Sequence, residues 1–294
     1  MLYLMTLPCI ILFALFSYMP MAGLVVAFKS FQYDAGIFGS EWSKPFYQNF
    51  VFFLSSESFF LVTWNTLFLN ILFIAGALVF QVSSALALNE VSGRLFKKVT
   101  QAGILLPYFV SWIVVSFFVF SFLNYDYGLV NGLLKSLGFE PVDWYTASGY
   151  WPVIMLILYI WKNVGYGCVV YLAVLTGVDK AYYEASEIDG ASKLQQIRHI
   201  SFPMMTPTII TLTLLAIGRI MNADFGMFYS VVGESPLLYS SVDVIDTFVF
   251  RSLRRLGDVG MASAAGFYQS VLSFILVLLS NRLSRRINEE GSIF

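Results

Sequence analysis

Charge is scarce in this sequence. Asp, Glu, Lys and Arg together make up 12% of the 294 residues, about half the share that is typical of a soluble globular domain. Hydrophobic residues make up 58%, and the mean hydropathy is +0.75. The formal net charge of -1 excludes the strongly basic surface that nucleic-acid binding requires. The composition therefore predicts a protein that crosses a membrane several times.

Histidine and cysteine are almost absent. The single histidine, His199, excludes any mechanism that needs two imidazoles. The two cysteines, Cys9 and Cys168, both lie inside apolar segments, so we expect buried small side chains rather than a disulfide or a metal pair. No metal site is predicted.

Catalytic motifs are missing as well. The chain has no G-x-x-x-x-G-K-[ST] phosphate-binding loop, so it cannot hydrolyse ATP by itself and is expected to bind no cofactor. It also has no G-x-S-x-G motif, and His199 lies outside the apolar segments, so a serine hydrolase in the membrane would lack its base. We therefore predict no catalytic residue and no enzyme activity in this chain.

Long apolar segments dominate what is present. Six of them match the length of a transmembrane helix, and no linker or low-complexity stretch divides the chain. We predict an all-α membrane protein that forms a single domain over residues 1–294. The predicted spans cover residues 2–28, 60–88, 99–122, 150–177, 204–222 and 261–280.

Positive charge is distributed unevenly between the loops. Nine Lys and Arg residues lie in the second loop, the fourth loop and the C-terminal tail, against six in the first, third and fifth loops. Lys and Arg close to span ends favour the cytoplasmic side of a membrane. We therefore expect loops two and four and both termini in the cytoplasm.

The fourth loop contains the one long polar stretch, from Tyr182 to Pro207. Residues with high helix propensity fill it, but Gly190 interrupts them. We predict a helix, a turn at Gly190 and a second helix that enters the membrane, with Asp189 and Ser192 as caps of the second helix. The acidic residues expected on the exposed face of this segment are Glu184, Glu187 and Asp189.

This stretch resembles the EAA motif of ABC importer permeases, in which Glu-Ala-Ala is followed by Gly and then by Ile-x-Leu-Pro. Ser186 stands in place of the second Ala, and Phe202 in place of the Leu, and both exchanges are conservative in size. The form Asp-Gly-Ala at residues 189–191 is typical of carbohydrate permeases. The positions that match in register are Glu184, Ala185, Gly190, Ile200 and Pro203.

The resemblance covers most of the chain. The outer segment 243–251 and the last span, residues 266–281, look like the oligosaccharide and polysaccharide branch, which includes maltose-type and alginate-type importers. The resemblance implies the transmembrane domain of a type I ABC importer, with six spans and a cytoplasmic coupling helix, in a bacterial inner membrane. The ATPase-coupling residues that it implies are Glu184, Ala185, Ser186, Asp189, Gly190 and Ala191.

The resemblance also implies a set of partners. These are a second homologous permease, an ATPase dimer that uses ATP and Mg, an extracytoplasmic substrate-binding protein and an oligosaccharide, with membrane lipid around the spans and no nucleic acid. Two other functions remain open: a permease for another small solute, and a secondary transporter or channel. A secondary transporter predicts a buried relay of acidic residues within the spans, and the spans contain none.

Polar residues inside the spans are candidates for the translocation pathway, because such groups are costly in lipid and often functional. Helix packing competes with this role for Lys162 and Asn163, since the glycines that follow them allow close approach of another helix. The full candidate set is Lys162, Asn163, Arg219, Asn222, Asp224, Tyr268 and Gln269.

Two pairs in this set suggest more specific contacts. Arg219 and Asp224 are near enough in sequence to form an ion pair at the end of the fifth span. The aromatic ring of Tyr268 and the amide of Gln269 suit stacking on a sugar ring and hydrogen bonding to its hydroxyls.

Three arginines in the fifth loop share one helix face. Arg251, Arg254 and Arg255 follow an i, i+3, i+4 spacing. A solvated face is one interpretation. The other is a docking surface for an acidic binding protein or for a substrate with uronate groups, which leads to the hypothesis that the oligosaccharide is acidic.

Overall fold

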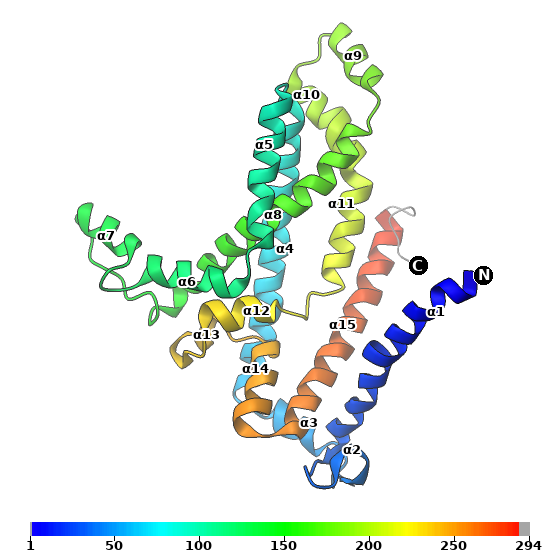
Figure 1. Cartoon of the computed structure of the whole chain (residues 1–294), viewed down its shortest axis with the longest axis vertical. Helices are drawn as coiled ribbons and strands as arrows, with labels where there is room; N and C mark the ends of the chain where they lie inside the picture. Colours follow the sequence, from blue (N-terminus) through cyan, green and yellow to red (C-terminus); the bar gives the residue numbers. More distant parts are fainter. Residues whose placement is uncertain (1, 288–294) are drawn as a thin grey trace. The chain divides into compact units, whose positions relative to one another are not determined.

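The computed structural model describes residues 2–287, and the side chains of residues 5–282. Helices make up most of the described chain (Figure 1). The chain divides into two compact units, Met1–Trp64 with Asp243–Leu272, and Asn65–Val242 with Ser273–Phe294. Helices α4 (Ser58–Glu90) and α15 (Val259–Ile287) begin in the first unit and end in the second.

The first unit starts with a long apolar helix. Helix α1 (Leu2–Phe13) continues through a π-helical turn and a 3₁₀ segment to Phe28, and most of its described side chains are exposed. Two short strands follow and pair antiparallel, with Lys29 opposite Trp42. The remaining elements of this unit are β1 (Lys29–Ser30), α2 (Gly36–Gly39), β2 (Glu41–Trp42), α3 (Gln48–Leu54) and α14 (Ile245–Arg251).

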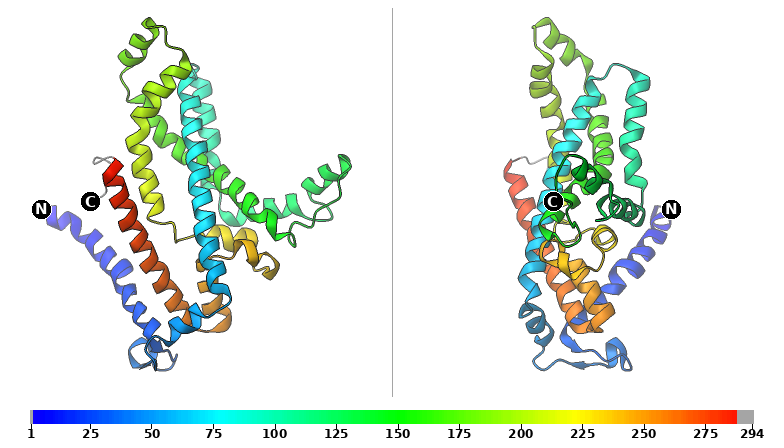
Figure 2. Two further views of the ribbon diagram at one scale, coloured as in Figure 1. Left: turned by 180° about the vertical axis from the view of Figure 1, so that it is seen from behind. Right: turned by 90° about the vertical axis from the view of Figure 1, so that its left-hand side faces the viewer.

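The second unit holds the other helices. Two of its short helices lie at the opposite ends of the long helix α8, as Figure 2 shows: α7 precedes α8, and α9 follows it. The elements of this unit are α5 (Arg94–Leu105), α6 (Trp112–Leu123), α7 (Leu129–Ser136), α8 (Trp151–Thr176), α9 (Lys180–Ile188), α10 (Lys193–Gln196), α11 (Phe202–Ile217), α12 (Phe225–Met227) and α13 (Tyr239–Val242).

Among residues 2–287, five helical segments are long and apolar enough to cross a bilayer, and a bent pair of helices is a sixth candidate. The bent pair corrects the continuous third span predicted over residues 99–122, because Arg94–Phe109 and Trp112–Leu123 meet at 96°. Pro107 lies in the 3₁₀ turn that ends the first piece, and Ser111 caps α6 by accepting a hydrogen bond from the amide of Val114. A proline near a helix end followed by a new N-cap breaks a helix rather than curving it.

The fifth span also differs from its prediction. Helix α11 ends at Ile217 rather than at residue 222, and Gly218 forms its C-cap. Residues 218–221 then form turns before α12. The composition of this segment does not reveal the end of the helix, since the apolar residues Ile220 and Met221 continue the pattern beyond Gly218.

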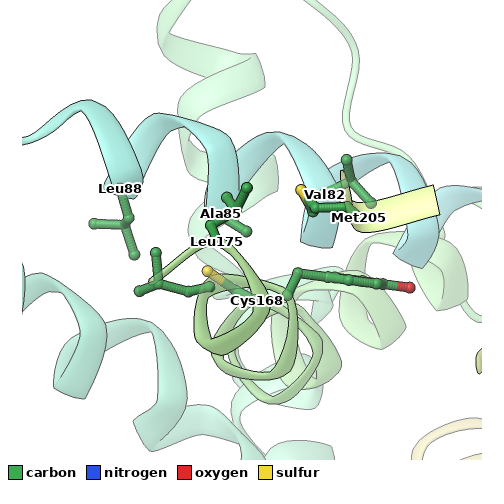
Figure 3. Packing of buried hydrophobic residues seen from close by; sticks show 8 residues of the cluster. Val82, Ala85, Leu88, Cys168, Leu175 and Met205 are labelled. Atoms are coloured by element: carbon green, nitrogen blue, oxygen red, sulfur yellow. The ribbon is translucent and has the colours of Figure 1, made fainter. Parts of the chain in front are cut away.

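The core of the second unit joins α4, α8 and α11. Val82, Ala85 and Leu88 of α4 pack against Cys168 and Leu175 of α8, together with Met205 of α11 (Figure 3). The predicted burial of Cys168 is confirmed, because its exposed fraction is 0%. The same prediction is wrong for Cys9, which is exposed on α1. An apolar neighbourhood in sequence does not bury a side chain on a helix that packs against little of its own chain.

Candidate functional site

The polar stretch of the fourth loop folds as a helix, a tight turn and a second helix. Asp179 caps α9, with its carboxylate accepting a hydrogen bond from the amide of Ala181 at 3.0 Å. After α9, Gly190 adopts a φ of +76°, and the amide of Ala191 donates to the carbonyl of Ser186 at 2.9 Å. Nothing lies within 4 Å of a Cβ built on Gly190, so its left-handed backbone, rather than lack of space, makes glycine the fitting residue.

A capping box starts the second helix. The hydroxyl of Ser192 accepts from the amide of Gln195, and the side chain of Gln195 accepts from the amide of Ser192 at 2.7 Å. The prediction for Ser192 is therefore confirmed. The prediction for Asp189 is wrong: Asp189 is the C-cap of α9. Asp189 precedes the Schellman-type turn at Gly190, so it lies at the end of α9 and not at the start of α10.

A buried glutamine ties the two helices together. Gln196 is 2% exposed. Its Nε2 donates to the hydroxyl of Ser186 at 2.9 Å and to the carbonyl of Tyr183 at 3.4 Å, and its Oε1 accepts from Nζ of Lys193 at 3.0 Å. The hydroxyls of Tyr183 and Ser201 lie 3.0 Å apart. Ser186 stands in place of the second Ala of the EAA motif. Its hydroxyl oxygen accepts the hydrogen bond from Gln196 that holds α9 to α10.

The other side of α9 faces outward. Glu184, Glu187 and Asp189 are exposed, as predicted. The same surface carries an apolar side chain that was not predicted from the sequence: Ile188 is 87% exposed. Solvation alone does not account for such a side chain outside the spans, so the face combines acidic groups with an apolar contact.

One of these acids has a partner within the segment. Nζ of Lys193 lies 2.8 Å from Oε1 of Glu187. The hydrogen bond from Lys193 is the main cause that lowers the pKa of Glu187 below its usual range. Both side chains are largely exposed, so solvent screening keeps this ion pair weak.

A chain of polar contacts surrounds the broken third span. Nζ of Lys162, in the middle of α8, donates to the carbonyls of Pro107, Tyr108 and Val110, which lie at the break. It also lies 5.1 Å from the centre of the Trp112 ring. Nε1 of Trp112 donates to Oδ2 of Asp224 at 2.7 Å. Lys162 and Asp224 are therefore brought together through Trp112.

The region around Asn163 is closely packed. Its side chain donates to the carbonyl of Tyr159 in its own helix at 2.9 Å, and its own carbonyl accepts from Gln81 of α4 at 3.1 Å. A Cβ on Gly165 would collide with the backbone at Ile104, and one on Gly167 would collide with the Gln81 side chain. These contacts support the packing interpretation for Asn163.

Arg219 and Asn222 lie in the turns after α11. The side chain of Arg219 is exposed. Asp224, the predicted partner of Arg219, instead accepts from Trp112 and, through Oδ1, from the amide of Met227 at 3.2 Å. Oδ1 of Asn222 accepts from the hydroxyl of Ser273 at 3.4 Å. Arg219, Asn222 and Asp224 are all exposed, but the carboxylate of Asp224 is already engaged by Trp112 and Met227.

Tyr268 and Gln269 are packed within the first unit. The Tyr268 ring meets Phe53 and Phe59 edge-on, with ring centres 5.5 and 5.4 Å away. Gln269 is 8% exposed and donates to the carboxylate of Asp246 at 3.1 Å. Tyr268 is half-buried, with its hydroxyl 3.4 Å from that of Thr63.

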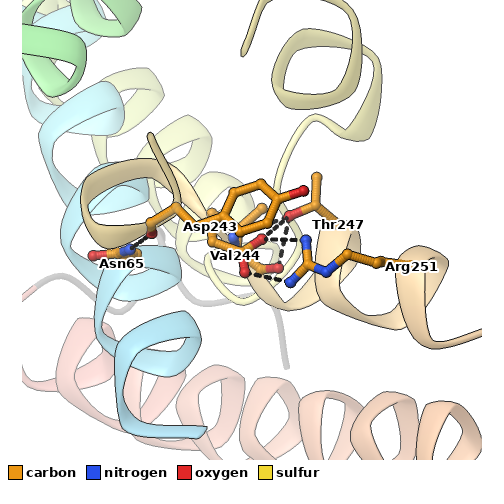
Figure 4. A network of polar contacts seen from close by, with 6 residues as sticks. Asn65, Asp243, Val244, Thr247 and Arg251 are labelled. Carbon is orange, nitrogen blue, oxygen red and sulfur yellow. Dashed lines mark hydrogen bonds and ion pairs between the residues drawn. The ribbon is translucent and has the colours of Figure 1, made fainter. Parts of the chain in front are cut away.

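The three arginines of the fifth loop have different environments. Arg251 forms a bidentate ion pair with Asp243, at 3.1 and 2.6 Å, and Thr247 donates to the same carboxylate at 2.8 Å (Figure 4). Asp243 is 3% exposed, so this pair holds the start of α14 in place. Arg254 is exposed over the ring of Phe250, and Arg255 is exposed as well. The shared face predicted from spacing is thus reduced to Arg254 and Arg255.

Within the described residues, no group of three His, Cys, Asp or Glu side chains is arranged to hold a metal ion. The described chain instead combines several helices long and apolar enough to cross a membrane with the polar segment around α9. Residues 77–289 match the family of the binding-protein-dependent transport system inner membrane component, which is more than half of the chain, and the protein belongs to this family. It is a permease subunit, and ATP hydrolysis in such systems belongs to a separate subunit.

Relatives of known name are sugar permeases. The chain is 36% identical over 290 residues to the polygalacturonan/rhamnogalacturonan transport system permease protein YteP of Bacillus subtilis, covering 99% of this chain and 89% of the relative. It is 30% identical over 283 residues to the trehalose/maltose transport system permease protein MalF of Thermococcus litoralis, covering 94% and 89%.

Solved structures agree with this class. The fold matches a chain in the crystal structure of a bacterial ABC transporter involved in the import of the acidic polysaccharide alginate, with a TM-score of 0.87, 33% identity and coverage of 98% of this chain and 96% of the other. A second match, with the same score and identity, comes from the alginate transporter in complex with an alginate pentasaccharide-bound periplasmic protein, and covers 97% and 94%.

Proposed function

We propose that this permease imports an acidic oligosaccharide and that α9 is the surface through which a partner ATPase drives it. The observation that carries the proposal is the construction of α9. Its inner face is fixed to α10 by Gln196, while Glu184, Ile188 and Asp189 face outward. A helix held in this way moves as one piece with α10 and α11 when a partner pushes on it.

The coupling surface consists of Glu184, Ala185, Asp189 and the Gly190 turn, with Ser186 and Ala191 on the side that faces α10. A dimer of ATPase subunits, which binds ATP and Mg, would close and draw this surface toward the equivalent surface of a second permease. The movement would pass along α11 to the turns that carry Arg219 and Asn222. Two conformations, open to opposite sides of the membrane, are sufficient for transport.

The orientation follows from the same assignment. An ATPase acts from the cytoplasm, so the coupling surface and both termini would be cytoplasmic and the first, third and fifth loops would face outward. The excess of Lys and Arg in loops two and four and in the C-terminal tail agrees with this orientation. A substrate-binding protein would then dock on the outer loops, where Arg254 and Arg255 are exposed.

An acidic substrate is favoured by the charge of the accessible groups. Arg219 is exposed beside the end of the fifth span, where a cation without a ligand is costly. Relatives named for polygalacturonan and alginate transport handle uronate polymers. Asn222 would add a hydrogen bond to the pathway, whereas Lys162, Asn163 and Asp224 would shape its wall through their contacts with the protein. Tyr268 and Gln269 would contact sugar only in another conformation.

The experiment is ATPase stimulation in the assembled transporter, reconstituted in nanodiscs with its binding protein and an oligogalacturonate. Glu184→Lys reverses a charge on the outer face of α9, and Gly190→Val strains the turn that ends it. We expect each to lower stimulated ATPase activity at least about tenfold, which corresponds to an increase of about 1.4 kcal/mol in the activation free energy. Lys180→Gln, an exposed change on the same helix, is the matched control.

Retained stimulation in both variants would refute coupling through α9. The substrate is tested separately with Arg219→Gln and Arg219→Lys. We expect Arg219→Gln to reduce uptake of the acidic oligosaccharide about tenfold and Arg219→Lys to retain part of it, because a lysine keeps the charge but loses the bidentate geometry. Equal uptake by all three proteins would remove Arg219 from substrate recognition.

A further inference from the structure

Helix α7 presents an apolar face that its own chain does not cover. Leu129, Leu133 and Leu137 follow an i, i+4, i+8 spacing, and their exposed fractions are 58%, 55% and 71%. Phe139, three residues after the end of the helix, is 63% exposed. The spacing places the three leucines on one side of the helix.

The opposite side of α7 is anchored by a buried asparagine. Asn131 is 1% exposed. Its Nδ2 donates to the carbonyls of Tyr125 at 3.2 Å and Val142 at 2.9 Å, and its Oδ1 accepts from the amide of Val142 and from Nε1 of Trp144, both at 3.0 Å. All four hydrogen-bonding positions of the side-chain amide are used. The leucines therefore cannot turn inward without breaking this network.

The network also reaches the next span. Nε1 of Trp151, the first residue of α8, donates to the carbonyl of Trp144 at 2.7 Å. Helix α7 begins six residues after α6 ends at Leu123. The segment between α6 and α8 is therefore a rigid connection at the point where two spans leave the apolar part of the membrane.

Exposed apolar side chains also precede α7 in the chain. Ile113, Phe117 and Phe118 of α6 are exposed apolar side chains of a span. Tyr125 and Tyr127, between α6 and α7, are 47% and 69% exposed, as is usual for aromatic residues at the level of lipid headgroups. The only charged residue within α7 is Lys135, while the acids of this connection lie outside the helix.

We infer that α7 lies in the headgroup layer of the membrane, with Leu129, Leu133 and Leu137 inserted among the lipid acyl chains. A helix with an apolar side, a polar side and no carboxylate has the properties of an interfacial helix. Through Asn131, Trp144 and Trp151 it fixes the adjoining ends of α6 and α8 at the membrane surface. The inference concerns this chain and lipid alone, so it does not depend on the proposed substrate.

Fluorescence quenching tests the inference in the assembled transporter in nanodiscs. In a Cys9→Ser background, Leu133→Cys is labelled with an environment-sensitive probe and exposed to lipid carrying a nitroxide on its acyl chain, or to aqueous iodide. Asp143→Cys, in the same connection but exposed and acidic, is the matched control. We expect lipid nitroxide to quench the Leu133 probe at least about threefold more than the Asp143 probe, and iodide to show the reverse.

Gly132→Cys gives a second probe on the exposed side of α7, since nothing lies within 4 Å of a Cβ at that position. It replaces Leu133→Cys if that variant does not assemble. Equal quenching of the helix and control probes by iodide would overturn the inference. So would a Leu133 probe that loses iodide quenching only when the binding protein is added, because that result assigns the face to a protein partner.

Discussion

Two short helices at the opposite ends of α8 are built in the same way and face different surroundings. Helices α7 and α9 both end at a glycine with positive φ, +82° at Gly138 and +76° at Gly190. In each, the amide of the next residue donates to a carbonyl five residues earlier, at 2.9 Å. The construction fixes where each helix lies, whereas the residues on its outward side decide what it meets.

The anchors are also alike. A buried amide side chain fixes each helix, Asn131 within α7 and Gln196 beside α9. The outward sides differ: α7 presents leucines, and α9 presents Glu184 and Asp189 around Ile188. A single structural device thus carries an apolar outward side at one end of α8 and an acidic outward side at the other.

Removing the anchor of α7 should have the largest effect. Asn131→Ala leaves the indole of Trp144 and the backbone of Val142 without partners, and we expect a loss of about 3 kcal/mol in stability. The measurement is the melting temperature of the purified transporter, followed by size-exclusion fluorescence. Ser136→Ala on the exposed side should leave it unchanged. A small shift for Asn131→Ala would mean that the network does not hold α7.

The anchor of α9 should matter more for coupling than for stability. Gln196→Ala removes the bond to Ser186, and we expect stimulated ATPase activity to fall about fivefold while the melting temperature changes little, since the lost interaction is worth about 1 kcal/mol. Arg198→Gln, an exposed change two positions further along the chain, is the control. Equal effects of the two variants would contradict a specific role for Gln196.

Because both helices end in the same kind of glycine turn, the same substitution can be compared at the two positions. Gly138→Ala and Gly190→Ala each place a Cβ on a residue with positive φ, at a cost of about 1 kcal/mol. We expect similar falls in melting temperature, because neither position is sterically crowded, but a loss of stimulated ATPase activity for Gly190→Ala alone. A loss of coupling in both variants would show that the two ends do not act separately.

The smallest effect is expected at Glu187. Because its pKa is lowered in the folded protein, its contact with Lys193 contributes stability above the pKa of the unfolded chain and loses it as the pH falls through the folded value, below the usual range of glutamate. Glu187→Gln should therefore leave ATPase activity between about pH 6 and pH 8 nearly unchanged. A marked pH dependence that disappears in Glu187→Gln would contradict this expectation.

Local features were predictable from the sequence, and long-range ones were not. The turn at Gly190 and the cap at Ser192 depend on neighbouring residues, and both are present. The burial of Gln196 and of Asn131 depends on residues 10 or more positions away, so composition could not reveal it. The same limit applies to the environment of Arg251. Its helical spacing predicted a surface shared with Arg254 and Arg255, but it pairs with the carboxylate of Asp243, eight residues away.

The cation at the broken third span has a consequence for the insulation of the membrane. Carbonyls released by a bend at this depth would normally attract water, and a file of water would lower the barrier to ions. Instead, Nζ of Lys162 donates hydrogen bonds to the carbonyls of Pro107, Tyr108 and Val110. A side chain of the protein thus takes the place of water at the bend. Its positive charge also repels other cations at this point of the chain.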